Sequence, residues 1–329
     1  MKLLVTGGLG FIGSNFILNT LKKFPDFSIV NIDDELEASN RLSLKQIENS
    51  KNYRFVKGNI TDKTLMEKLI LDCDQIINFA AESHVDRSIA NAKPFIDTNI
   101  LGVFTILELL KKHDKKFIQI STDEVFGDLK TGSAVENSYL NPSSPYSSSK
   151  ASAELLINSY IITYGIRANI TRCTNNYGPR QFIEKLIPKT IILADQNKKI
   201  PIYNQGKGIR DWMHVDDHCN AIHSVMLDGK DGEKYNISSG NELDVLSVIQ
   251  RILSIMGKSK DNYEYAENRP GHDDRYSLDS SKIRHKLGWK PNVNFDSGLH
   301  ETIDWYLKNR DWWINSDLEI LDGYQWKSS

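Results

Sequence analysis

Gly7-Gly8-Leu9-Gly10-Phe11-Ile12-Gly13 stands between a short apolar run, Lys2 to Thr6, and a segment whose apolar residues recur at helical spacing. Glycines at these places permit a tight turn, let the backbone approach a pyrophosphate and aim amide donors at it. A second strand, Ser28 to Ile32, ends in Asp33, where an acid accepts a hydrogen bond from the adenosine ribose and repels a 2′-phosphate. The stretch therefore predicts a dinucleotide-binding fold that takes NAD. The alternative is a glycine turn needed only for packing.

Further apolar strands alternate with amphipathic helices along the first half of the chain. They are predicted at 53–56, 75–79, 117–121 and 167–172. This alternation predicts an α/β fold with a Rossmann-type, doubly wound parallel sheet. The turn-rich Asn175-Asn176-Tyr177-Gly178-Pro179 then leaves the sheet, and we expect a smaller, interleaved C-terminal α/β domain. The expected division is 1–173 with a returning segment at about 213–238 for NAD, and 174–212 with 239–329 for the substrate.

Composition excludes several other classes of protein. The 329 residues are 40% hydrophobic and 26% charged, with a formal net charge of -2, so no general binding of nucleic acid or membrane surfaces is expected. The three cysteines, which form no C-x-x-C pair, favour a reducing compartment. No leader and no apolar run of membrane-spanning length stand out, so we expect a cytoplasmic protein.

Two polar groups are candidates for chemistry. Thr122-Asp123-Glu124 directly follows the strand at 117–121, and ligands bind at the carboxyl ends of such strands. Tyr146 and Lys150, four residues apart, share one face of a predicted helix, where an ammonium is expected to make the phenol easier to ionise. Taken alone, each group has an ordinary structural explanation as a helix start or a chance match.

Two helices are candidates for a dimer surface. They are predicted at about 94–113 and 145–164, and a homodimer through them is expected. His214 and His218 have the i, i+4 spacing of a metal pair, but no third ligand is evident, so no metal is expected.

The order of the motifs resembles the extended short-chain dehydrogenase/reductase family, and within it the dTDP-glucose 4,6-dehydratases. The resemblance covers nearly the full length of the chain. Beyond the glycine turn and Tyr146-x-x-x-Lys150, it is carried by Ala80-Ala81-Glu82-Ser83-His84-Val85-Asp86-Arg87-Ser88, Ser121-Thr122-Asp123-Glu124-Val125, Asn175-Asn176-Tyr177-Gly178-Pro179, Glu184-Lys185-Leu186-Ile187-Pro188, Arg210-Asp211-Trp212 and Arg269-Pro270-Gly271-His272-Asp273.

The resemblance implies an NAD-dependent lyase that dehydrates a nucleoside-diphosphate hexose, with dTDP-glucose as the expected substrate. Tyr146, helped by Lys150 and Thr122, would take the proton of the sugar's 4-hydroxyl while hydride leaves C4. Glu124 would then remove the C5 proton and Asp123 would protonate the departing 6-hydroxyl, before hydride returns to C6. The product would be a 4-keto-6-deoxy sugar nucleotide, with NAD tightly bound and regenerated at each turnover.

The resemblance also assigns two sets of binding residues. Those expected at the cofactor are Gly7, Gly10, Phe11, Ile12, Gly13, Asp33, Asn59, Ile60, Phe79, Ala80, Ala81, Ser83, Thr98, Tyr146, Lys150 and Asn176. Those expected at the nucleotide sugar are Ser83, His84, Thr122, Asn175, Lys185, Leu186, Pro201, Tyr203, Arg210, Arg269 and His272. Three of the latter, Lys185, Arg210 and Arg269, would supply the positive charge that a diphosphate requires.

Two other functions remain open on the sequence. A nucleotide-sugar 4-epimerase, or another sugar-nucleotide short-chain dehydrogenase, would keep Tyr146 and Lys150 without needing the Asp123-Glu124 pair. A non-enzymatic NAD sensor of the same fold would be expected to have lost Tyr146 or Lys150. Asp34-Glu35-Leu36-Glu37 departs from the family pattern after Asp33, and the base of the nucleotide and the hexose stay open.

Overall fold

Seven strands form one parallel sheet in the computed structural model, which describes residues 1–268, 270–271, 273–321 and 325–327. Each strand pairs in parallel with its neighbours, so the predicted doubly wound sheet is confirmed. The order reverses between β1 and β4, the place where such sheets bind ligands. In spatial order the strands are β10 (Lys234–Ile237), β6 (Ala168–Cys173), β5 (Lys116–Thr122), β4 (Gln75–Asn78), β1 (Lys2–Thr6), β2 (Ser28–Asp33) and β3 (Tyr53–Lys57).

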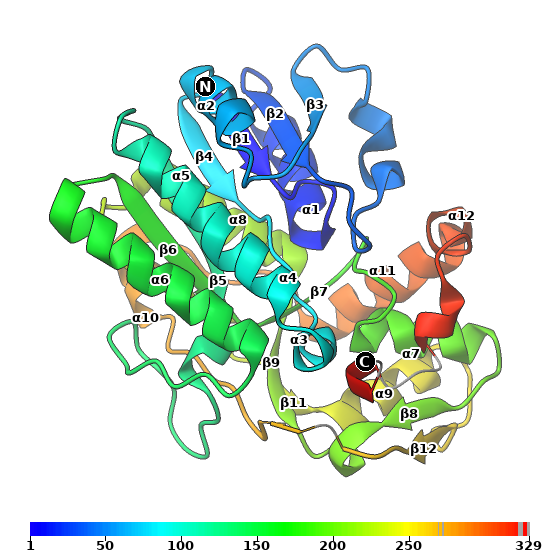
Figure 1. Ribbon diagram of the computed structural model, residues 1–329. Helices are drawn as coiled ribbons and strands as arrows, with labels where there is room; N and C mark the ends of the chain where they lie inside the picture. Colours follow the sequence, from blue (N-terminus) through cyan, green and yellow to red (C-terminus); the bar gives the residue numbers. More distant parts are fainter. Residues whose placement is uncertain (269, 272, 322–324, 328–329) are drawn as a thin grey trace.

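Both faces of this sheet are buried, as the unbroken apolar runs of its strands require. Leu3 packs in one core with α1 (Phe11–Lys23), α8 (Val215–Asp228) and α10 (Ser281–Leu287). Leu4 points the other way, into a core with α2 (Lys63–Leu71), α5 (Val103–Leu110) and α6 (Pro145–Tyr164). In Figure 1, α5 and α6 lie side by side on one face and α8 on the other.

A smaller α/β part is built from the second half of the chain, at the lower right of Figure 1. Its core is a separate apolar cluster that includes Tyr177, Trp212 and Tyr306. One sheet is formed by β7 (Asn175–Tyr177), β9 (Ile209–His214) and β11 (Glu242–Asp244), and another by β8 (Ile200–Ile202) and β12 (Tyr263–Tyr265). Its helices are α7 (Leu186–Asp195), α9 (Val245–Ile255), α11 (Phe295–Lys308) and α12 (Arg310–Trp313).

The helix expected at 94–113 is not regular throughout. After α3 (Val85–Ala90), it runs as α4 (Lys93–Ile96), a π-helical turn over Asp97–Gly102, and α5. In this turn the Asn99 amide bonds both to the backbone of Glu82 and to the Ser149 hydroxyl of α6. The wider turn thus accommodates a polar link between helix and cleft, a common use of π turns. Short 3-10 helices cover Arg41–Ile47, Asp123–Phe126, Tyr203–Gly206, Leu318–Leu321 and Gln325–Lys327.

None of the helices in the described part of the chain is both long enough and apolar enough to span a membrane.

Candidate active site

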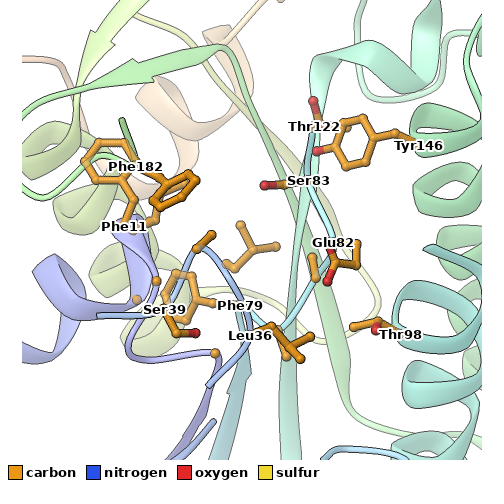
Figure 2. A pocket seen from close by; sticks show the side chains of 18 of the residues that line it. Phe11, Leu36, Ser39, Phe79, Glu82, Ser83, Thr98, Thr122, Tyr146 and Phe182 are labelled. Atoms are coloured by element: carbon orange, nitrogen blue, oxygen red, sulfur yellow. The ribbon is translucent and has the colours of Figure 1, made fainter. Parts of the chain in front are cut away.

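One cleft at the carboxyl ends of the central strands brings the predicted site residues together. All sixteen residues expected at the cofactor line it, from the Gly7 turn to Asn176. All five residues expected to be catalytic, from Thr122 to Lys150, line it as well. Figure 2 shows Tyr146 beside Thr122 at one end of the cleft, with Phe79, Leu36 and Thr98 further along it.

The glycine turn is built for close backbone packing and for an anion. Gly7 has a left-handed φ of 67°, and a Cβ on Gly13 would lie 2.5 Å from the Gly7 carbonyl oxygen. Helix α1 starts at Gly10 without a side-chain cap, and Gly10, Phe11 and Ile12 line the cleft. The first-turn amides of α1 are therefore available to a pyrophosphate, which the helix dipole favours. The turn fits the phosphates of NAD, although packing alone already requires Gly7 and Gly13.

Asp33 ends β2, as predicted, and is only 6% exposed. Its Oδ2 accepts the Leu9 amide at 2.9 Å, and its Oδ1 accepts the Glu35 amide at 2.9 Å and the Ser39 hydroxyl at 2.7 Å. A carboxylate accepts about four hydrogen bonds, so one acceptor position is left for a ribose hydroxyl. The protein contacts fix the carboxylate in place beside the glycine turn.

The acidic residues after Asp33, which depart from the family pattern, are all engaged within the protein. Asp34 accepts a hydrogen bond of 2.8 Å from Nδ2 of Asn59. Glu35, whose φ is 58°, pairs with Arg41 and with Lys57. Arg41 and Lys57 together hold the pKa of Glu35 at about 2. Because the charge of Glu35 is neutralised and Asp34 is hydrogen-bonded, the segment can border a cleft meant for an anionic cofactor.

Tyr146 and Lys150 are positioned by a well-defined helix start. Ser144 and Ser147 form a capping box and Pro145 occupies the first turn of α6, so Tyr146 faces the cleft. Lys150, one turn later, donates from Nζ to the Ile120 carbonyl of β5 at 2.6 Å. Burial lowers the pKa of Lys150 to about 8, so its ammonium keeps its charge at neutral pH.

The expectation that Lys150 makes the Tyr146 phenol easier to ionise is wrong for the protein alone. The pKa of Tyr146 is raised well above its ordinary value, first by burial and then by the charge of Glu124. A hydrogen bond with Thr122 lowers this pKa, but not enough to offset burial. Loss of solvation thus dominates the ionisation of this phenol.

Asp123 and Glu124 stand side by side in the short helix that follows β5. Burial, and next the charge of Glu124, raise the pKa of Asp123 to about 8, so this carboxyl is protonated at neutral pH. Thr122 donates to its Oδ1 at 3.1 Å, while its buried Oδ2 has no hydrogen-bond partner among the described residues. A protonated carboxyl with an unpartnered oxygen at the wall of a cleft can donate a proton to a bound ligand.

The residues expected at the nucleotide sugar divide into three groups. Ser83, Thr122, Asn175 and Lys185 line the cleft. Arg269 and His272 lie outside the described residues. The remaining five do not line the cleft; they are His84, Leu186, Pro201, Tyr203 and Arg210.

Two of those five have clear local contacts. His84 caps α3, accepting the Arg87 amide at its Nδ1. Arg210 donates to the carbonyls of Ile209, Asp273 and Asp274 and lies over the Tyr276 ring.

Several cleft residues were not identified from the sequence. Glu82, Arg87 and Glu184 belong to the motifs that carried the resemblance, so the signal was present without a role attached. Phe182 had no such signal, and Figure 2 shows it next to Phe11 on one side of the cleft. Arg87 bridges two carboxylates, Glu37 and Glu184, and so ties the segment after β2 to the smaller part of the protein.

Over residues 1–268, 270–271, 273–321 and 325–327, no three His, Cys, Asp or Glu residues gather as a metal would need. The two histidines at metal-pair spacing have other contacts. His214 caps α8 and His218 bonds to Asn176 at 3.0 Å.

Comparison with known proteins places this geometry among nucleotide-sugar enzymes. The family model described as GDP-mannose 4,6 dehydratase matches residues 4–302. The chain is 42% identical over 317 residues to the dTDP-glucose 4,6-dehydratase of Mycobacterium tuberculosis (strain ATCC 25618 / H37Rv), with 95% of both chains covered. It superposes with a TM-score of 0.91 on the crystal structure of dTDP-glucose 4,6-dehydratase from Bacillus anthracis in complex with NAD; the two are 44% identical, and 96% of this chain and 100% of that chain are covered.

Epimerases share the fold at lower identity. The UDP-glucuronic acid 4-epimerase from Bacillus cereus, in complex with UDP-glucuronic acid and NAD, has a TM-score of 0.88 and 29% identity, over 94% of this chain and 99% of that chain.

Proposed function

The chain belongs to the GDP-mannose 4,6 dehydratase family, and from this premise we propose that it converts dTDP-glucose to the 4-keto-6-deoxy sugar nucleotide by loss of water. The choice of dTDP-glucose follows two relatives, 42% and 44% identical to this chain, that carry that substrate in their names. The observation that carries the proposal is the buried carboxyl of Asp123, whose Oδ2 has no hydrogen-bond partner among the described residues, next to Glu124 in the wall of the Tyr146 cleft. An acid and a base side by side are what elimination of water requires.

NAD is the cofactor, and when bound it supplies the hydride acceptor for C4 and the hydride donor for C6 of the sugar. The glycine turn and the first-turn amides of α1 would hold its pyrophosphate, and Asp33 its adenosine ribose. Phe79, Ala80 and Ala81, at the end of β4, line the deeper part of the same cleft. The arrangement supports tight binding, since the Arg87 bridge to Glu37 and Glu184 spans the same cleft.

In the first half of the reaction, Tyr146 takes the proton of the 4-hydroxyl and Thr122 hydrogen-bonds the same oxygen. Because burial raises the pKa of Tyr146, its phenol needs cationic help to lose its own proton. We assign that help to Lys150 and to the positive charge of the oxidised cofactor. The 4-ketone that results makes the neighbouring C5 hydrogen acidic.

In the second half, Glu124 takes the C5 proton as general base. Asp123 gives its proton to the 6-oxygen, so the C6–O bond breaks and water leaves. Hydride addition at C6, with a proton at C5, completes the 6-deoxy sugar. The sum is the substrate minus one water, with no change in the oxidation state of the cofactor.

Incubation without added NAD tests the proposal directly. The purified protein should form a 4-keto product from dTDP-glucose, and more slowly or not at all from UDP-glucose. Formation of a 4-epimer instead would favour the epimerase function, for which the shared Tyr146 and Lys150 are sufficient. Failure to turn over either nucleotide sugar would contradict the proposal.

Turnover should fall at alkaline pH in a two-proton step. Asp123 must hold its proton to act as acid, and that proton is lost as pH rises through about 8. Lys150 must hold its charge, which is lost over the same range, at about 8. kcat should therefore fall as pH rises above this range, with a contribution from each group. Asp123→Asn should be much slower and keep only the fall that follows Lys150; a pH-independent kcat up to alkaline pH would contradict the assignment.

We also propose that the protein is a homodimer through the outer faces of α4 to α6. These helices expose large apolar side chains to solvent, namely Ile96, Leu101, Phe104, Leu155, Ile162 and Tyr164. Ile162, 75% exposed, should be covered by the partner in such a dimer. Ile162→Lys should elute as a monomer in size-exclusion chromatography with light scattering, whereas Leu227→Lys, on α8, should elute like the parent protein. A monomeric parent would contradict the proposal.

Two further proposals concern organisation and location. Residues 1–173 with 213–238 would bind NAD and 174–212 with 239–329 the nucleotide sugar, although Ile283 and Trp289 pack in a core of the large sheet. A cytoplasmic location is supported by the three buried, free cysteines.

A further inference from the structure

A buried ion pair joins helix α6 to strand β6, next to the end of β5 that carries Thr122. Glu154 of α6 and Arg172 of β6 are each 1% exposed. Arg172 Nη2 lies 2.6 Å from Glu154 Oε2, and its Nε lies 3.0 and 3.1 Å from the two carboxylate oxygens. The pair is thus bidentate and shielded from solvent. Because such a pair adds little net stability over apolar packing, its value lies in fixed geometry.

The pair is bonded to the end of the catalytic strand. Ser121, directly before Thr122, donates from its hydroxyl to Glu154 Oε1 at 2.6 Å. Ser121 is also the residue of β5 that pairs in register with Arg172. The Arg172 guanidinium lies 4.7 Å from the ring centroid of Phe126, in the same short helix as Asp123 and Glu124. The buried guanidinium of Arg172 therefore contacts the short helix that carries Asp123 and Glu124, and through Glu154 it is linked to the end of β5.

The same helix face carries the other half of the site. Tyr146, Lys150 and Glu154 follow one another at four-residue spacing along α6, so they form a single stripe. Two of them bond to consecutive residues of β5, Lys150 to the Ile120 carbonyl and Glu154 to the Ser121 hydroxyl. These two links set the register between the Tyr146 helix and the Thr122 strand end.

We propose that Glu154, held by Arg172, is a positioning residue that keeps Thr122 and the acid pair aligned with Tyr146 and keeps Lys150 charged. The inference rests on the proposed dehydration. The proposed effect on the charge of Lys150 has separate support, since Glu154 raises the pKa of Lys150 against the effect of burial. The other group acting on Lys150 is the Cys173 thiol of β6, which burial keeps protonated because it raises the pKa of that thiol. The guanidinium of Arg172 is paired with Glu154.

Glu154→Gln is the direct test, in the purified full-length enzyme with NAD bound. Misalignment of reacting groups by a fraction of an ångström to one ångström should lower kcat about 10- to 100-fold, with KM within about twofold of the parent value. The alkaline fall of kcat should begin at lower pH, because Lys150 loses its charge more easily. Glu154→Asp keeps the charge and should return the alkaline limb to the parent pH. Glu233→Gln, which breaks the partly exposed pair with Lys282 just before β10, should change neither kcat nor the pH profile.

Two results would overturn the inference while leaving the dehydration intact: a parent-like kcat in Glu154→Gln, or a lower melting temperature with an unmoved pH profile. Should Glu154→Gln fail to fold, Ser121→Ala removes the hydrogen bond from β5 to Glu154 and should lower kcat about tenfold at unchanged KM. Parent-like kcat in Ser121→Ala would also overturn it. Absence of 4-keto product from the parent enzyme would instead refute the proposed function itself.

Discussion

Glu124→Gln should abolish release of the dehydrated product while leaving NAD bound. The amide keeps the shape of the side chain but cannot accept the C5 proton, so kcat should fall by at least about 1,000-fold, near the upper range for loss of a general base. Oxidation at C4 does not need Glu124, so a single turnover should leave reduced nicotinamide, visible by its absorbance. The elimination step alone is then blocked.

An exposed glutamate provides the control for this variant. Glu264 of β12 lies on the surface of the smaller part, and Glu264→Gln should turn over like the parent. Parent-like turnover of Glu124→Gln would refute the role of Glu124 as base.

Tyr146→Phe should stop the reaction one step earlier. The ring would keep its edge contact with Phe95, whose centroid lies 6.3 Å away, so the fold should be retained. The group that accepts the 4-hydroxyl proton is lost, and kcat should fall at least about 1,000-fold. Unlike Glu124→Gln, this variant should accumulate no reduced nicotinamide, because hydride cannot leave C4 while its oxygen keeps the proton.

Tyr139→Phe is the matched control, since this tyrosine is 96% exposed on a loop and should tolerate the change. Reduced nicotinamide in Tyr146→Phe at the level seen with Glu124→Gln would contradict the assigned order of steps.

The parts of the fold that the sequence predicted correctly are those with strong local patterns. The glycine turn, the apolar strands and the i, i+4 pair of Tyr146 and Lys150 each depend on residues close together in the chain. The topology of the sheet then brings these residues together, because the carboxyl ends of parallel strands lie along one edge of the sheet. This is why all the residues expected at the cofactor line a single cleft.

What the sequence could not predict depends on burial and on distant contacts. The pKa of Tyr146 is raised chiefly by burial, and burial of a helix start is not visible in a four-residue spacing. The π turn over Asp97–Gly102 depends on contacts of Asn99 with Glu82 and Ser149 from two other segments. Phe182 enters the cleft from a turn without any motif. The acidic segment after Asp33 is tolerated because Arg41, Lys57 and Arg87 reach it from elsewhere in the fold.

The central claim is that hydride taken from C4 is returned to C6 of the same sugar. The most direct measurement follows dTDP-glucose carrying deuterium at C4 through the enzyme without added NAD. We predict a 4-keto-6-deoxy product with the deuterium at C6, formed over many turnovers with the bound NAD unchanged in amount. Loss of the deuterium to solvent, or one reduced cofactor for each product, would contradict the account.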